Sequence, residues 1–226
     1  MNKIPRVYID PGHSSVDPGA VGYEVERDLN EKVSRYQNEH LLANYICETK
    51  VDPITNNSLQ AVANAANAWG ADLLVSNHFN SGRGDGWEGL VHNEKRVAMG
   101  KIFEKHVKAA GQNSRGVKLR PGLAVLRLSN MPAILNEGAF VDNKKDIADW
   151  NEEHELKKLG IAYAEATAEY LKLEKTPVPV PEETVPDEEY LYRVQVGAYR
   201  SAEGAANMRD KLKAAGFPGI IVKSAK

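Results

Sequence analysis

Val7-Tyr8-Ile9-Asp10-Pro11-Gly12-His13 is the stretch around which the rest of the chain is organised. Its apolar residues predict a buried strand, and the Pro-Gly pair predicts a turn that leaves His13 at the strand's end. A second predicted strand, Asp72 to His78, also ends in a histidine. A third, Ala133 to Gly138, carries Glu137 near its end. These residues predict a functional site where the strands end at one edge of a sheet.

Helical and strand periods alternate along the chain, which favours an α/β fold. We therefore expect a twisted, mostly parallel sheet covered by helices on both faces. The loop over residues 14–25, rich in Gly, Pro and Asp, should cross the sheet edge next to His13. The expected helices are 28–40, 59–69, 97–110 and 156–170, and the further expected strands are 45–51, 87–92 and 123–128.

Composition changes after Leu173. The stretch 174–189 contains four prolines among acidic residues, which is typical of a semi-rigid linker. Beyond it, 192–199 predicts a strand, Ser201 an N-cap for a helix that ends at Gly216, and 220–222 a second strand. We therefore predict a domain over 1–173, a linker over 174–189 and a small βαβ unit over 190–226.

The overall composition restricts the classes of partner. The 226 residues include 29 Lys and Arg against 31 Asp and Glu, a formal charge of −2, so no strong field indicates a nucleic-acid partner. The single cysteine, Cys47, excludes an intrachain disulfide. No apolar run reaches the ~18 residues of a spanning helix, and the first residues have no secretory signal pattern. We expect synthesis in the cytoplasm and action after lysis or by an unusual export route.

Two histidines and a carboxylate provide ligands that suit zinc. Catalytic zinc sites commonly have three protein ligands and an open position for water, and His13, Glu26 and His78 supply such a set. Bound zinc can lower the pKa of water to ~7, which makes amide hydrolysis feasible. Glu137 is then the candidate general acid/base. Glu24 and Glu31 are rival carboxylates for the metal.

Four motifs, in order, carry a family resemblance. They are Asp10-Pro11-Gly12-His13, Glu26-Arg27, the stretch from Ser76 to Asn80 and the stretch from Pro132 to Asn143. Over roughly Ile4 to Leu173 the chain resembles the type-3 family of zinc-dependent N-acetylmuramoyl-L-alanine amidases. The resemblance implies one zinc ion on His13, Glu26 and His78, with Glu137 as the catalytic acid/base. It favours Glu26 over its two rivals.

The implied substrate is peptidoglycan, cleaved at the amide that joins the lactyl group of N-acetylmuramic acid to L-alanine. Asn80 and Asn136 are predicted to line the substrate groove, with a structural role as the alternative. The segment 51–57 lacks an arginine often found there in relatives, so contacts to the glycopeptide should differ in that region.

The tail from Tyr192 to Lys223 resembles half of a SPOR wall-binding module. A lone βαβ unit has an open sheet edge, which favours self-association or docking on the catalytic domain. The sequence is compatible with both a phage endolysin and a bacterial autolysin. Two further alternatives are a zinc peptidase that cuts within the stem peptide and a non-catalytic wall-binding protein.

Overall fold

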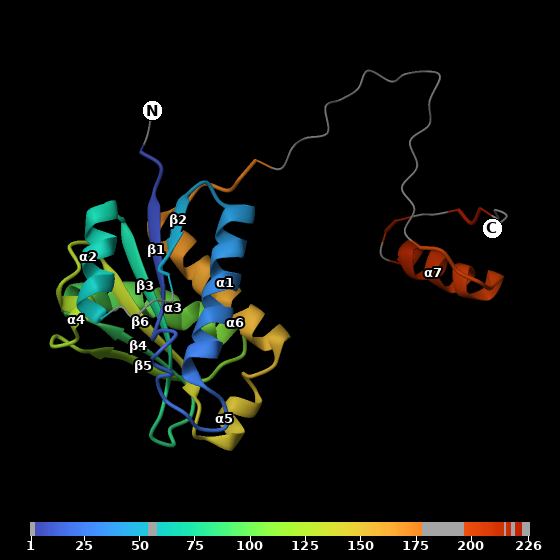
Figure 1. The fold of residues 1–226 in the computed structure, drawn as a ribbon. Coiled ribbons are helices and arrows are strands. Elements are labelled where there is room, and N and C mark those ends of the chain that lie inside the picture. Colours follow the sequence, from blue (N-terminus) through green and yellow to red (C-terminus); the bar gives the residue numbers. More distant parts are fainter. Residues whose placement is uncertain (1–2, 54–57, 178–196, 215, 218–219, 223–226) are drawn as a thin grey trace. The chain divides into compact units, whose positions relative to one another are not determined.

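The computed structural model describes residues 3–53, 58–177, 197–214, 216–217 and 220–222. These residues divide between two compact units, 1–177 and 178–226, and each unit is described by itself. The first unit is a sheet between two layers of helices (Figure 1).

The sheet has six strands in the order β2-β1-β3-β6-β4-β5. Strands β2, β1, β3 and β6 run parallel, whereas β4 is antiparallel to β6 and β5 is parallel to β4. The mostly parallel sheet predicted from the sequence is therefore confirmed. The strand bounds are β1 Arg6–Pro11, β2 Glu48–Val51, β3 Leu73–Asn80, β4 Trp87–Val91, β5 Ser114–Leu119 and β6 Ala133–Phe140.

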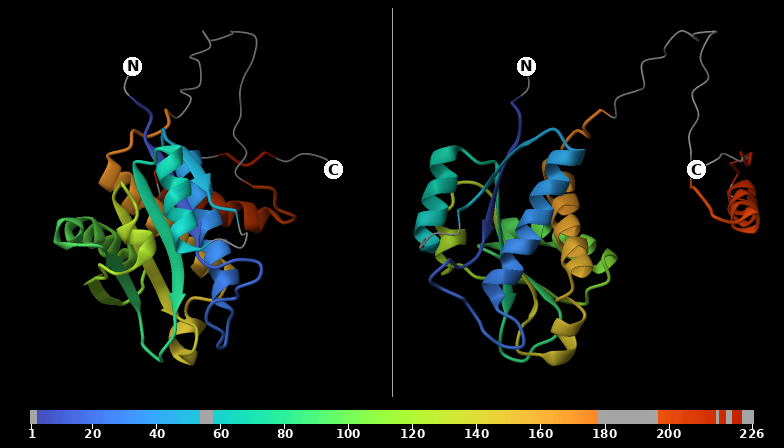
Figure 2. Two further views of the ribbon diagram at one scale, coloured as in Figure 1. Left: turned by 60° about the vertical axis from the view of Figure 1, so that its left-hand side comes forward. Right: turned by 45° about the vertical axis from the view of Figure 1, so that its right-hand side comes forward.

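Helices cover both faces of the sheet (Figure 2). One face packs against α1 (Glu26–Asn44), α3 (Val97–Ala109) and α6 (Glu153–Leu171), and the other against α2 (Leu59–Trp69) and α4 (Ala124–Arg127). Successive side chains of a strand point to opposite faces. Thus Val7 and Ile9 join the core under α1 and α6, whereas Tyr8 between them joins the core under α2.

Helix α2 begins and ends at the residues predicted from the sequence. The Ser58 side chain accepts a hydrogen bond from the backbone N–H of Ala61, as an N-cap residue should. Gly70 ends the helix in the left-handed conformation, with φ of 72°.

One predicted strand of the first unit is wrong. The stretch 123–128 forms the short helix α4, in which Arg127 N–H donates to the Leu123 carbonyl. A short apolar run fits a helix or a strand equally well, and here Val125 and Leu126 are buried in the core beside α2. The strand in this region is instead β5, at the sheet edge. Two further elements were not predicted from the sequence, the helix α5 (Lys144–Ala148) and the 3₁₀ turn Glu94–Arg96.

In the second unit the predicted helix is confirmed as α7 (Ala202–Ala214). Ser201 Oγ accepts from Gly204 N–H, and Gly216 follows the helix with φ of 88°. The predicted strand 220–222 is not formed, because these residues have no strand partner among the described ones, and Ile220 is 85% exposed. Most of the predicted strand 192–199 lies outside the described residues.

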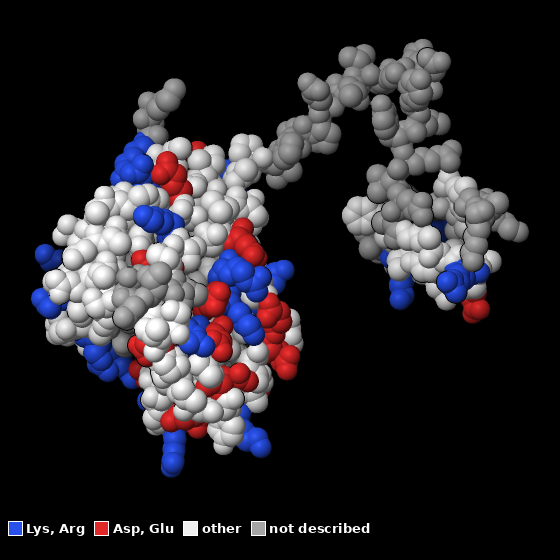
Figure 3. Space-filling view, in the orientation of Figure 1, with Lys and Arg blue, Asp and Glu red and all other residues white. Residues whose placement is uncertain are grey.

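The surface is mixed in charge, in keeping with the formal net charge of −2. On the face shown in Figure 3, acidic and basic side chains are interspersed. Ion pairs such as Arg35 with Glu153, between α1 and α6, contribute to this pattern. In the described part of the chain, no helix is both long and apolar enough to cross a bilayer.

Candidate metal centre and active site

The predicted site residues meet at one edge of the sheet. His78 lies near the end of β3, and its Cα partner on β6 is Glu137. Paired residues of neighbouring strands point to the same face. Both side chains therefore lie on the face that α2 and α4 cover, beyond the core of Tyr8, Leu74 and Leu135.

His13 reaches the same place by an unusual backbone conformation. It follows β1 with φ of +73°, in the left-handed region that non-glycine residues seldom adopt. Its ring lies against that of His78, with centroids 5.1 Å apart. Gly12 makes this approach possible, because a Cβ there would lie 2.2 Å from the His78 ring.

Glu26, the first residue of α1, lies between the two histidines. Its Oε2 is 3.0 Å from His13 Nε2, and its Oε1 is 2.8 Å from His78 Nδ1. Ala20 N–H also donates to Oε2. Burial alone would raise the pKa of Glu26, but the hydrogen bonds to His13 and His78 outweigh it and hold the pKa far below its usual value.

The donor set fits a zinc ion. His13, Glu26 and His78 each offer one ligand atom, and these atoms lie within 4.8 Å of one another. Ligands placed 2.0–2.1 Å from a tetrahedral zinc lie about 3.3 Å apart. The Glu26 oxygens lie 3.0 and 2.8 Å from His13 Nε2 and His78 Nδ1, which is of that order. In addition, His78 Nε2 is buried without a hydrogen-bond partner among the described residues, as is common at functional sites. Two imidazoles and one carboxylate are borderline ligands of the kind that zinc prefers.

Asp17 completes the surroundings of His13. Its Oδ2 is 2.9 Å from His13 Nδ1, on the side of the ring away from Glu26. Its Oδ1 accepts from Gly19 N–H, and the two hydrogen bonds lower the pKa of Asp17. Asp17 was not among the residues predicted from the sequence. Its position four residues after a candidate metal ligand, just before Pro18-Gly19, was the available signal.

Glu137 lies on β6, directly opposite His78 of the neighbouring strand β3. Its Oε2 is buried with no hydrogen-bond partner among the described residues. Burial raises its pKa to about 7, with the Glu26 and Glu88 charges adding to the rise and His78 opposing it. A carboxyl group that titrates near neutrality can both accept and donate a proton.

Comparison with known proteins then fixes the family. The family model described as N-acetylmuramoyl-L-alanine amidase matches residues 7–169. The chain belongs to this family. The resemblance read from the four motifs is confirmed, and with it the enzyme class.

Related proteins agree with this assignment. The sporulation-specific N-acetylmuramoyl-L-alanine amidase of Bacillus subtilis (strain 168) is 29% identical, over 96% of this chain and 84% of its own length. An endolysin of Bacillus phage SPP1 is 31% identical over 77% of this chain and 68% of its own. The solved catalytic domain of CwlV, an amidase from Bacillus (Paenibacillus) polymyxa var. colistinus, has a TM-score of 0.71 at 26% identity and covers 76% of this chain and 100% of that one.

The amidase also matches the SPOR domain model, over residues 160–223. The start of that match overlaps α6, where Tyr163 and Ala166 are buried in the core of the first unit. The described part of the match outside the first unit is therefore chiefly α7.

The two asparagines predicted to line the substrate groove lie differently in the amidase. Asn80 ends β3, half-buried, and its Oδ1 accepts from Ser81 N–H. Asn136 is fully buried and donates to Asn77 Oδ1, on the face toward α1. Residues on that face are separated from His78 and Glu137 by the sheet, so the geometry favours the structural alternative for Asn136.

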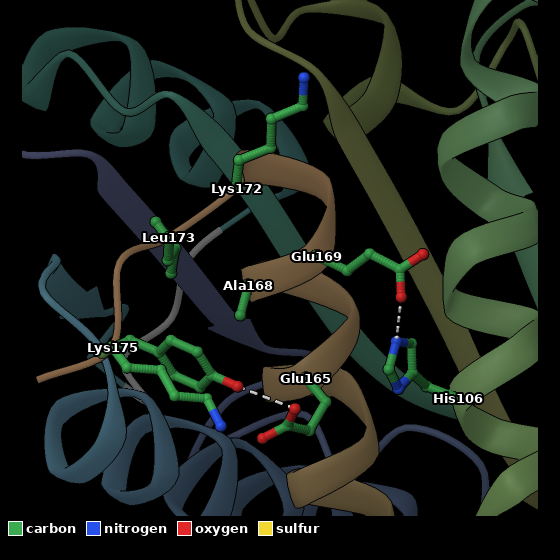
Figure 4. Close-up of a pocket in the computed structure, with 8 residues that line it drawn as sticks. His106, Glu165, Ala168, Glu169, Lys172, Leu173 and Lys175 are labelled. Carbon is green, nitrogen blue, oxygen red and sulfur yellow. Dashed lines mark hydrogen bonds and ion pairs between the residues drawn. The ribbon is translucent and has the colours of Figure 1, made fainter.

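The rival carboxylates lie outside the metal-ligand cluster. Glu24 accepts a hydrogen bond from Asn151, and Glu31 is exposed on α1. A surface cavity of about 310 Å³ also lies elsewhere, beside Tyr45, His106 and Glu165 near the C-terminal ends of α1 and α6 (Figure 4). Because α1 has 19 residues, this cavity lies about 27 Å from the end of the helix that carries Glu26. It is not part of the candidate metal centre.

Proposed function

We propose that the chain hydrolyses the amide between the lactyl group of N-acetylmuramic acid and L-alanine in peptidoglycan, with zinc held by His13, Glu26 and His78 and with Glu137 as general acid/base. The observation that supports this best is the convergence of the three ligand atoms one strand away from a buried carboxyl group.

The protein residues have separate tasks in this reaction. When bound, a zinc ion supplies a Lewis acid that polarises the amide carbonyl and acidifies water. Asp17 orients the ring of His13, and Gly12 gives the His78 ring its place. Glu137 takes the proton from the attacking water and returns it to the leaving amine, since its pKa of about 7 permits both transfers near neutral pH.

The nature of the products separates this reaction from the two alternatives. Cleavage at the lactyl amide yields a free L-alanine amino terminus and a lactyl carboxylate, whereas a peptidase acting within the stem would leave that amide intact. A wall-binding protein without activity has no need for three ligands and a general base.

The decisive experiment measures zinc content and products together. Purified protein should contain one zinc per chain and release L-alanine amino termini from peptidoglycan, and a chelator should stop the release. His13→Ala or His78→Ala should lose zinc and activity in parallel. Glu137→Gln should keep the zinc while turnover falls by ~10²–10⁴-fold, because an amide cannot accept the water proton.

Two results would contradict the proposal. Full turnover in a zinc-free His78→Ala variant would exclude the metal, and near-normal turnover in Glu137→Gln would require another base. Glu24→Gln serves as the matched control, since Glu24 is a neighbouring carboxylate outside the cluster.

For the chain as a whole we propose a catalytic domain over 1–173, a linker over 174–189 and a wall-binding half repeat over 190–226. Support comes from the SPOR match and from the change in composition after Leu173. Peptidoglycan would then contact the protein twice, at the catalytic site and at the half repeat. Self-association through the half repeat is the second candidate role for this unit.

A further inference from the structure

A row of charged side chains continues from Glu137 to the far edge of the sheet. The Cα partner of Glu137 on β4 is Glu88, so both side chains lie on the same face. Glu88 is only 5% exposed. It is stabilised by two cations of β5, Arg115 and Lys118, whose Nε and Nζ both donate to Glu88 Oε1.

A β-bulge brings these two cations to one face. Between β4 and β5, Trp87 pairs with Ser114 and Gly89 with Val117, so three steps on β5 oppose two on β4. Residues 115 and 118 would point to opposite faces of a regular strand. Gly116, with φ of +86°, adopts the backbone conformation that the bulge requires. As a result, both long side chains reach Glu88.

The bulged pair carries more positive charge than Glu88 neutralises. Two cations on one carboxylate leave a net charge of +1, and the side chains of Arg115 and Lys118 are 43% and 32% exposed. Arg115 uses Nε for Glu88, while its guanidinium lies 5.3 Å from the centre of the Phe140 ring. No acceptor for its two terminal nitrogens is found among the described residues. Arg115 is thus held through Nε, while its two terminal nitrogens remain available for a bidentate partner.

We propose that Arg115 and Lys118 form a subsite that binds a free carboxylate of the stem peptide, on the leaving-amine side of the scissile bond. This inference rests on the proposed function. On the glycan side the lactyl carboxyl group is consumed in the scissile amide, so the anionic groups within reach belong to the peptide.

The spacing agrees with this assignment. β5 is two strands away from Glu137, about 10 Å at the usual strand separation. An extended peptide advances about 3.3–3.6 Å per residue, so the subsite lies two or three residues beyond the cleaved amide. Acidic residues at the second and third positions of the stem would place a carboxylate there.

The test compares two muramoyl tripeptides that differ only in their acidic groups. One has free carboxylates at the second and third residues, and in the other every carboxyl group is amidated. The native enzyme should have a KM about tenfold lower for the carboxylate peptide, as expected for a charge-assisted hydrogen bond. Arg115→Gln and Lys118→Gln should lose that preference, and Arg115→Lys should keep part of it.

A matched control is available on the other side of the sheet. Lys101 on α3 also pairs with a glutamate, Glu104, at 2.6 Å, but α3 packs on the face of the sheet opposite to the row. Lys101→Gln should retain the full preference for the carboxylate peptide. Thermal unfolding of each variant shows whether it is folded.

Binding to the Glu137→Gln protein separates this inference from the proposed function. Calorimetry with the two tripeptides needs no turnover, and the carboxylate peptide should bind about tenfold more tightly. Equal affinity for both peptides would overturn the subsite even if the amide is cleaved. A clear preference with no cleavage would contradict the proposed reaction and leave the subsite standing.

Discussion

At the scale of single residues, the proposed metal centre depends on side chains other than its three proposed ligands. Asp17 holds Nδ1 of His13, so that Nε2 points toward Glu26. Metal-binding histidines generally donate their second ring N–H to a carboxylate or a carbonyl, and losing that partner commonly lowers metal affinity 10–100-fold.

We therefore expect Asp17→Ala to lower zinc affinity by about 10–100-fold, because the His13 ring loses the acceptor that fixes its orientation. Asp17→Asn should have a smaller effect, since the amide oxygen can still accept. Competition with a chromophoric chelator measures the affinity. Asp28→Ala, an exposed aspartate of α1 paired with Arg27, is the control. Unchanged affinity in Asp17→Ala would show that the loop backbone alone positions His13.

The sequence predicted the residues of the proposed centre but not the residues that support them, for a physical reason. His13 follows β1 and His78 and Glu137 lie in the second halves of β3 and β6, where the strand periodicity marks the position. The hydrogen bond from Asp17 and the burial of Asn136 depend on the path of a loop and on the face of the sheet. The alternation of residues along a strand assigns them to two faces of the sheet, but it does not tell which face carries the functional site.

At the scale of elements, α6 is held between two neighbouring helices by two glutamates one turn apart. Glu165 Oε1 lies 2.6 Å from His40 Nε2 of α1, and its Oε2 accepts from Tyr45. Glu169 Oε2 lies 2.7 Å from His106 Nε2 of α3. Figure 4 marks this contact with a dashed line. Burial raises the pKa of Tyr45 to about 12, together with the Glu165 contact.

The pKa of Glu165 predicts how this contact depends on pH. Burial alone would raise that pKa, but the hydrogen bonds from His40 and Tyr45 lower it below the ordinary value of 4.5. The unfolded chain then binds the proton more readily than the folded one, so the contribution to stability is present above pH 4.5 and falls as the pH drops further. Glu165→Gln should lower the melting temperature at pH 7 and flatten its decline in acid. Exposed Glu31→Gln should change neither. Parallel melting curves for Glu165→Gln and native protein across pH 3–7 would contradict this account.

The elements themselves differed in how well the sequence predicted them. Helices with a cap and a glycine stop, such as α2 and α7, were predicted almost to the residue. β5 was missed because Ser-Arg-Gly-Val-Lys-Leu has a glycine and two cations where a strand usually has apolar residues. Those same residues make the bulge and the charged pair, so the irregularity that hid the strand carries its proposed function.

At the scale of the whole molecule, the chain just after α6 belongs to the catalytic unit. Ile46 N–H donates to the Glu174 carbonyl and Thr176 N–H to the Asn44 carbonyl, so this segment runs beside the end of α1. The first compact unit accordingly extends to Pro177. A truncated protein should therefore end after Pro177, because a stop at Leu173 would remove both hydrogen bonds.

Removing everything after Pro177 should leave hydrolysis of a small soluble muramoyl peptide unchanged, because the three proposed metal ligands, Glu137 and the residues that support them lie in the first unit. On intact sacculi the truncated protein should sediment less and cleave more slowly. The half repeat would otherwise add a second contact that raises the effective concentration of the catalytic domain at an insoluble substrate.

A second variant keeps the whole chain and changes only two exposed apolar residues near its end. Phe217 and Ile220 are 69% and 85% exposed, so they are available to a partner. Replacing both with serine should weaken sedimentation as the truncation does if wall binding uses this surface. If the half repeat serves self-association instead, full-length and truncated protein should sediment equally. The mass of the full-length protein in light scattering should then rise with concentration. It should drop to that of a monomer when the two residues are changed. The two roles therefore make opposite predictions for the same pair of measurements, because only self-association depends on a second copy of the chain.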